Sequence, residues 1–157
     1  MKRIFLYGLL LYIFHHCDAQ KLEIKYYPSF HLNGKCVITY NDKGTCVLQF
    51  DIIDRKDTSK VWWSETRTVS VKYLEDINRM FEIANNLSSY KSFCMDGIQI
   101  VGVFESDTLI NEFVFHCLSK RERNIQYDFS KQSITTMLKV LKDRKSRRYV
   151  RVIREYL

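Results

Sequence analysis

The sequence contains little proline and little glycine, with one Pro and five Gly among its 157 residues. Flexible linkers between domains are usually rich in these residues, so the composition leaves no room for one. We find neither internal repeats nor low-complexity tracts. A hydrophobic share of 46% and an aromatic share of 14% are too high for a disordered chain. The sequence therefore predicts one folded domain.

Motifs that specify a reaction or a cofactor are missing from the sequence. It contains no Gly-rich phosphate loop, no EF-hand loop, no specific nucleic-acid motif and no CxxC or Cys/His spacing suited to zinc. The segment Ser88–Lys91 has an SxxK spacing that resembles penicillin-binding enzymes, but it follows a predicted helix instead of starting one, and the partner motifs are missing. We therefore assign no metal ligand, no cofactor and no catalytic residue.

Histidine gives little support to an enzyme. Only His31 and His116 lie outside the first 19 residues, and nothing near either of them in the sequence marks it as a base. His116 adjoins Cys117, but neighbours on a strand point to opposite faces of a sheet, so the two cannot act together as base and nucleophile. A histidine in the core or on the sheet surface is the favoured interpretation.

Residues 1–19 have the pattern of a signal peptide. Two basic residues precede an unbroken apolar and aromatic run, Ile4–Phe14. A short polar segment follows, in which Cys17 and Ala19 place small side chains three and one positions before a cleavage site. Cleavage there would leave a mature chain that starts at Gln20.

Two other interpretations of this segment stay open. A permanent anchor needs about 20 apolar residues to cross the hydrocarbon of a bilayer, and the run Ile4–Phe14 stops short of that. A bacterial lipoprotein would carry its lipid on Cys17, but the residue before a lipidated Cys is normally small and His16 is bulky. We expect an exported protein, periplasmic or extracellular, with no transmembrane helix after cleavage and with a lipid anchor at Cys17 as the minority alternative.

Apolar and polar residues alternate in the first half of the chain, which is typical of half-buried strands. Leu22–Phe30 shows this alternation, and Pro28 indicates an edge strand or the end of a strand. A hairpin is predicted around the turn residues 41–44. A polar loop at residues 54–60 precedes another strand, for which an interruption is expected at Ser64–Glu65. The strands expected after the first are Cys36–Tyr40, Cys46–Ile53, and Val61–Trp63 continued by Arg67–Val71.

The hydrophobic period lengthens to three and four residues after Tyr73, which predicts an amphipathic helix. A second hairpin follows around Ser106–Asp107, and its strands are so apolar that we expect both of their faces to be partly covered. A final helix would begin at Ser130, which can cap its first turn. The hairpin strands are Ile98–Glu105 and Leu109–Leu118, and the buried face of the first helix contains Leu74, Ile77, Phe81, Ala84 and Leu87.

This order of elements predicts an α+β fold. We expect an antiparallel β-sheet of about six strands, with two clear hairpins and with two amphipathic helices packed on one face. A signal peptide would occupy residues 1–19, a single α+β domain residues 20–141, and a basic amphipathic C-terminal tail residues 142–157.

Positive charge is concentrated at the C-terminal end of the chain. The net charge is +7, and removal of the leader, with two basic residues and one acidic residue, lowers it to +6. Residues 139–157 contain eight basic and two acidic residues, so the rest of the domain is neutral. Clustered charge creates a local potential that favours contact with a polyanion. The residues expected to contact an anion or a partner are Lys142, Arg144, Lys145, Arg147, Arg148, Arg151 and Arg154.

The basic tail also has a simpler interpretation, as a solvated helix that frays at the end of the chain. Apolar residues such as Tyr149, Val150 and Ile153 lie between the arginines, however, and would form an amphipathic helix. Its apolar side must pack on the domain, on a partner or on a membrane surface. Outside the cytoplasm, the candidate anions are lipid head groups, an acidic polysaccharide, extracellular nucleic acid or an acidic protein.

Trp62 and Trp63 are the most conspicuous aromatic pair. Because neighbours on a strand point to opposite faces, one ring should face the core. The other ring would be an exposed platform for a sugar or a peptide.

Four cysteines remain once Cys17 is removed with the leader, and export would permit disulfides. A regular turn would place Cys36 and Cys46 on opposite faces of their hairpin, which disfavours a bond between them. Pairing of the second hairpin around Ser106–Asp107 brings Cys94 and Cys117 to the same face, so we predict that these two form a disulfide. Buried free thiols are the alternative.

These features favour an exported, non-enzymatic binding or interaction module whose basic tail contacts an anionic surface or partner. One alternative is a small secreted hydrolase whose site is assembled only in three dimensions, which would require a pocket that joins His31 or His116 to a carboxylate. Another is a secreted inhibitor or an immunity-type protein, which the sequence does not separate from the favoured hypothesis.

Overall fold

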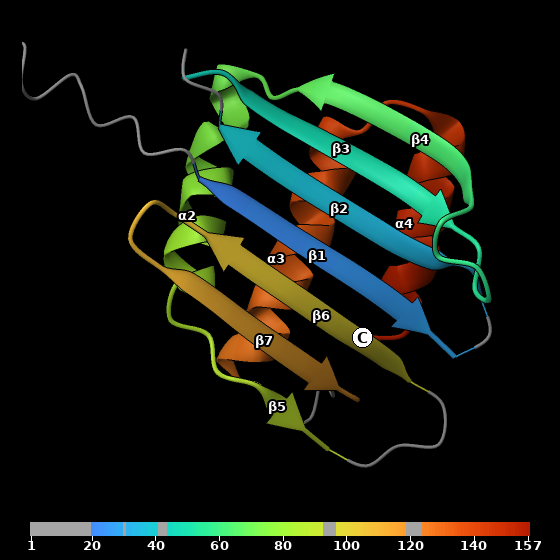
Figure 1. Ribbon diagram of the computed structural model, residues 1–157. Coiled ribbons are helices and arrows are strands. Elements are labelled where there is room, and N and C mark those ends of the chain that lie inside the picture. Colours follow the sequence, from blue (N-terminus) through green and yellow to red (C-terminus); the bar gives the residue numbers. More distant parts are fainter. Residues whose placement is uncertain (1–19, 30, 41–43, 93–96, 119–123) are drawn as a thin grey trace, which may run out of the picture.

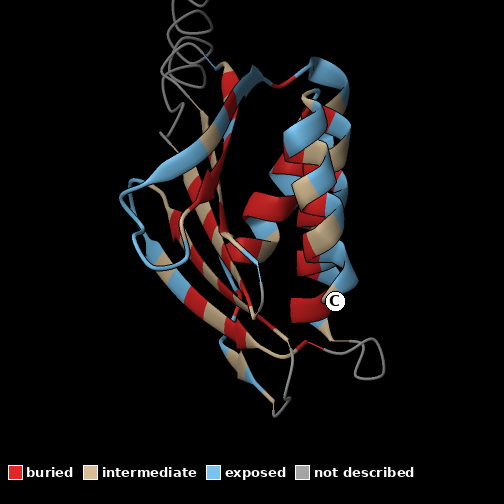
Figure 2. Ribbon diagram, turned by 90° about the vertical axis from the view of Figure 1, so that its right-hand side faces the viewer, coloured by how far each residue is buried: buried red, intermediate tan, exposed pale blue. Residues whose placement is uncertain are grey.

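The computed structural model describes residues 20–29, 31–40, 44–92, 97–118 and 124–157. The sheet and the helices form two layers (Figures 1 and 2). The strands are β1 (Lys21–Pro28), β2 (Asn33–Tyr40), β3 (Cys46–Ile53), β4 (Val61–Thr68), β5 (Tyr90–Lys91), β6 (Ile98–Glu105) and β7 (Ile110–His116). The helices are the 3₁₀ turn η1 (Val71–Tyr73), α2 (Leu74–Ala84), α3 (Ile125–Val140) and α4 (Arg144–Glu155).

Among the described residues, seven strands form one sheet in the order β4-β3-β2-β1-β6-β7-β5. All neighbours are antiparallel except β5 and β7, which are parallel. The helices α2, α3 and α4 cover one face of the sheet (Figure 1). The structure therefore confirms the predicted α+β class and the helices on one face. The described residues contain one strand more than expected, because β5 has only two residues and gives no alternating pattern. They also contain three long helices instead of the two expected on this face, because the predicted C-terminal tail forms α4.

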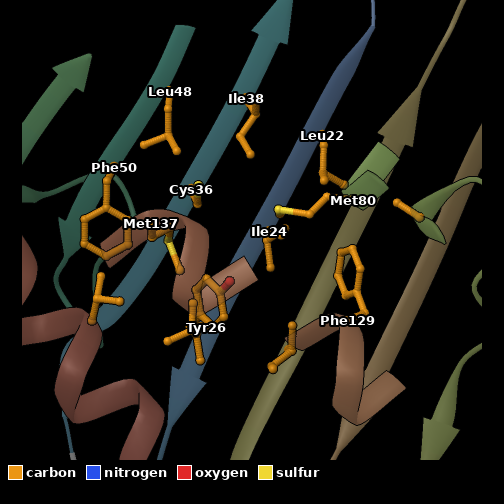
Figure 3. Close-up of a cluster of buried hydrophobic side chains, with 14 of the residues drawn as sticks. Leu22, Ile24, Tyr26, Cys36, Ile38, Leu48, Phe50, Met80, Phe129 and Met137 are labelled. Atoms are coloured by element: carbon orange, nitrogen blue, oxygen red, sulfur yellow. The ribbon is translucent and has the colours of Figure 1, made fainter. Parts of the chain in front are cut away.

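The central strand β1 shows why this sequence forms a one-sided sheet. Its residues alternate between buried and half-buried, and Leu22, Ile24 and Tyr26 point toward the helices, where they enter the core (Figure 3). β1 lies between β2 and β6. Pro28 is its last residue, so of the two explanations for this proline the strand terminus is correct and the edge position is wrong.

The strands of the second hairpin are covered on one face only, which corrects the expectation that both faces are partly covered. β6 alternates strictly, with Ile98, Ile100 and Phe104 buried and Val101 and Val103 half-buried. Because all three long helices pack on the same side, the second set of apolar side chains stays partly in solvent.

Helix α3 begins earlier than predicted. Its N-cap is Asn124, whose side chain accepts a hydrogen bond of 2.8 Å from the backbone N–H of Tyr127. Ser130 is buried within the helix and donates its hydroxyl to the carbonyl of Gln126 at 2.8 Å, so the predicted cap at Ser130 is wrong. Several buried residues in the first half of α3 are polar, so the sequence there does not show the apolar periodicity of an amphipathic helix.

The first hairpin has a longer connection than a regular turn, with Tyr40 opposite Cys46. Both Cys36 and Cys46 therefore point into the core, and the prediction of opposite faces is wrong. Cys36 lies opposite Phe50, four positions along β3 from Cys46, or about 13 Å at the rise of a strand. Both thiols are free. The predicted pair Cys94 and Cys117 stays a prediction, because Cys94 lies outside the described residues.

Gly102 allows a phenylalanine to cover the sheet. It lies directly opposite Phe113, whose ring occupies the place that a Cβ on residue 102 would need. The ring cannot move easily, because it is buried and packs on Phe115 and Phe129 at centroid distances of 5.0 and 5.4 Å.

We expect Gly102→Ala to lower the free energy of unfolding by about 3 kcal/mol, because it overpacks this cluster. Denaturation with urea measures the change. Val103→Ala, on the uncovered face of the same strand, is the control and should cost about 1 kcal/mol or less. Equal stability of Gly102→Ala and the unmodified protein would contradict the proposed role of Gly102.

Candidate functional site

Most of the basic C-terminal segment lies in α4, which packs on the sheet. Ser146, Val150 and Ile153 are buried and belong to the side that faces the sheet and α3. The apolar side of this helix was expected to pack on the domain, on a partner or on a membrane surface. In the structure it packs on the domain. The opposite side of α4 is exposed and carries most of its arginines.

A buried carboxylate holds the start of α4 against β4. Glu65 accepts hydrogen bonds from the backbone N–H groups of Lys142 at 2.8 Å and Asp143 at 3.1 Å, and from Arg67 Nε at 2.6 Å. Burial raises the pKa of this carboxyl, but the hydrogen bonds from Ser146, Lys142, Arg67 and Asp143 outweigh burial and lower the pKa to about 2. Glu65 is therefore ionised at neutral pH and fixes α4 in place.

A β-bulge determines how the two tryptophans lie. Ile52 pairs with Trp63 and Ile53 pairs with Val61, so Trp62 is the extra residue of β4. Trp62 is 57% exposed, and its Nε1 donates to Asp54 at 3.1 Å.

Trp63 is half-buried and lies against the core. Its Nε1 donates to Ser146 Oγ on α4 at 3.1 Å, and Lys145 Nζ lies 4.3 Å from the ring centroid. This cation–π contact joins a residue of the predicted aromatic pair to a residue of the predicted basic set.

A groove of about 400 Å³ lies between α4 and the end of the sheet where β3 leads into β4. Its walls are apolar and aromatic, two cationic side chains border it, and none of the described residues that line it is acidic. The Tyr149 hydroxyl donates to the Leu32 carbonyl and ties α4 to the connection between β1 and β2. The lining residues are His31, Leu32, Ile52, Trp62, Trp63, Lys145, Arg148, Tyr149 and Val152.

The predicted basic residues have different positions. Lys145 and Arg148 border the groove. Arg147 has an internal role, because its Nη1 donates to the carbonyls of Leu138 at 2.7 Å and Leu141 at 3.1 Å, at the end of α3. The remaining ones are exposed on the surface outside the groove: Lys142, Arg144, Arg151 and Arg154.

The sequence identified Trp62 and Trp63 but not the other apolar residues of the groove, and it did not identify Glu65. A spacing of three and four residues marks one side of a helix. This spacing could have grouped four of the groove residues from the sequence: Lys145, Arg148, Tyr149 and Val152. Nothing in the sequence marked Glu65 as a structural residue, because an acidic residue in an exposed strand is usually solvated.

His31 lies in the connection between β1 and β2, whereas His116 is the last residue of β7. His31 borders the groove, with its ring 5.9 Å from that of Tyr156. His116 Nε2 forms a hydrogen bond of 3.4 Å with Gln99 Nε2. Within the described ranges, no hydrogen bond joins either histidine to a carboxylate, and no cluster of His, Cys, Asp and Glu is suited to a metal.

Comparison of the chain with protein-family models, with curated proteins and with solved structures gave no match. In the part of the chain that the structure describes, no helix has both the length and the apolar character needed to cross a membrane.

Proposed function

We propose that the protein is a non-enzymatic binding module that holds an anionic partner in the groove between β4 and α4. The lining of the groove carries this proposal, because two tryptophans and two cationic side chains meet there beside apolar residues. Such a surface suits a partner that combines apolar groups with negative charge.

The charges at the groove are available to a partner. In the described part of the chain, the ion pairs involve other basic residues, such as Lys21 with Glu105 and Lys139 with Asp76. Lys145 and Arg148 have no carboxylate within ion-pair distance among the described residues. Lys145 is instead held over the ring of Trp63, which fixes its direction without neutralising it.

We propose an acidic protein as the partner instead of a polysaccharide or a lipid surface, because its side chains can supply both carboxylates and apolar groups. Its carboxylates would face Lys145 and Arg148, and its apolar side chains would contact Trp62 and Val152. The signal-like pattern of residues 1–19 supports a partner outside the cytoplasm. An inhibitor or immunity-type protein would use the same surface.

The test is binding of poly-L-glutamate at low salt, measured by isothermal titration calorimetry. We expect the double variant Lys145→Glu and Arg148→Glu to weaken binding by at least about tenfold, because it replaces attraction with repulsion at the groove. Binding to the unmodified protein should also weaken as salt is added.

The matched control is the double variant Arg151→Glu and Arg154→Glu, on the same helix but outside the groove. It changes the net charge by the same amount, and we expect it to weaken binding by less than about threefold. Equal losses in the two double variants would show that binding follows net charge alone, and the groove would not be the site.

A further inference from the structure

β4 is a long strand at the open edge of the sheet. It contains eight residues and occupies one end of the strand order, whereas the strand at the other end, β5, contains two. All of its residues except Trp63 and Glu65 are exposed. Figure 1 shows β4 at the margin of the sheet, with no described strand beyond it.

The direction of the backbone groups on β4 follows from one hydrogen bond. The N–H of Val69, just after β4, donates to the carbonyl of Cys46 at 2.8 Å. Because successive residues of a strand direct their backbone groups to alternate sides, the N–H and C=O groups of Ser64, Thr66 and Thr68 point away from β3. They form a row that an added strand can pair with.

Side chains next to this edge give it a preference for negative charge. Glu65 and Arg67 neutralise each other at a distance of 2.6 Å. Beside them begins α4, whose first residues carry Arg144, Lys145 and, just before the helix, Lys142, against Asp143 alone. A strand added to β4 would therefore place every second side chain next to a surplus of positive charge.

The groove continues this surface at the Trp62 end of β4. Trp62 and Trp63 belong both to β4 and to the lining of the groove. One extended segment can therefore pair with Ser64–Thr68 and place the side chains at its end in the groove.

We propose that the partner is an acidic, extended protein segment that adds to β4 as a further strand of the sheet. This inference rests on the proposed function, because it assigns the kind of partner and its conformation to the same groove. Main-chain hydrogen bonds along the edge would hold the segment, and its acidic side chains would face Lys142, Lys145 and Arg148.

The probe is a synthetic acetylated peptide in which glutamate alternates with valine, and fluorescence polarisation measures its binding. Two further peptides carry N-methyl groups on either the glutamate or the valine amides. Successive amide N–H groups of a strand point to opposite sides, so either the glutamate amides or the valine amides can face β4, but not both. We expect one methylated peptide to lose at least about tenfold in affinity and the other to lose less than about threefold. Equal affinities of the two would overturn the added strand.

A variant of the protein tests the same edge. Thr66→Pro removes an N–H that points away from β3, and proline is tolerated at such edge positions. We expect it to weaken binding of the unmodified peptide by at least about tenfold, whereas Thr66→Ala, which keeps the N–H, should bind normally. If the peptide binds Thr66→Pro as tightly as the unmodified protein, the inference is contradicted. If Thr66→Pro fails to fold, the affinities of the methylated peptides for the unmodified protein test the added strand instead.

The combined results separate the two proposals. If poly-L-glutamate binds through Lys145 and Arg148 but the alternating peptide does not bind, the added strand is wrong and the proposed function stands. If neither probe depends on these two residues, both proposals fail. A dimer in analytical ultracentrifugation that Thr66→Pro dissociates would show that a second copy occupies the edge, which would overturn the assignment of an acidic partner.

Discussion

Truncation of the chain after Leu141 should unfold the protein and abolish its cooperative thermal transition in circular dichroism. The truncation removes α4, whose Val150 and Ile153 are fully buried. Burial of a large aliphatic side chain contributes about 1.5–3 kcal/mol, and loss of α4 also exposes core residues such as Phe50, which packs on Tyr149. Because domains are stable by only about 5–15 kcal/mol, we expect no stable fragment.

The control for this prediction changes the charge of α4 and leaves its buried side intact. The double variant Arg148→Glu and Arg151→Glu alters two exposed positions. Its free energy of unfolding should stay within about 1 kcal/mol of that of the unmodified protein. A truncated chain that still unfolds cooperatively would show that α4 is an appendage and not part of the core.

This expected unfolding also determines how binding is to be tested. Deletion of residues 142–157 would abolish binding whether or not the basic residues contact the partner, because Glu65 would lose its two backbone donors and the groove would lose one wall. Substitutions at exposed positions of α4 avoid this problem.

The fold could be predicted from the sequence where the hydrophobic period is local. The strands Cys46–Ile53 and Ile98–Glu105 have the predicted bounds, because a sheet covered on one face produces a plain alternation. The start of α3 could not be predicted, since Gln126 in its first turn is polar yet buried, and its amide donates at 3.3 Å to the carbonyl of Ser88, 38 residues away in the sequence. Such a partner is visible only in three dimensions.

The sequence predicted some residues of the candidate site but not how they come together. Trp62 and Trp63 were identified as a platform, and Lys145 and Arg148 as part of a basic tail, but nothing in the sequence placed the two sets side by side. Their meeting depends on the bulge in β4 and on the docking of α4. Glu65 fixes that docking through hydrogen bonds to residues 77 and 78 positions away, and spacing rules do not extend so far.

Replacement of Glu65 by glutamine should destabilise the protein by about 3 kcal/mol at pH 7. The carboxylate accepts hydrogen bonds from α4 and from Arg67, and a neutral amide cannot replace its charge. The magnitude corresponds to the lowering of the pKa from 4.5 to about 2, at about 1.36 kcal/mol per pKa unit. Glu82→Gln, at an exposed position of α2, is the matched control and should cost less than about 0.5 kcal/mol.

The effect of Glu65→Gln should depend on pH in a defined direction. Because the pKa of Glu65 is lower in the folded protein than in the unfolded chain, the carboxylate contributes its full stabilisation above about pH 4.5. This contribution is lost as the pH falls from about 4.5 to about 2, where the folded carboxyl also takes up its proton. Urea denaturation of both proteins between pH 7 and pH 2 should show the difference in unfolding free energy shrinking over that interval. A difference that stays constant with pH would mean that Glu65 holds α4 by packing and not by its charge.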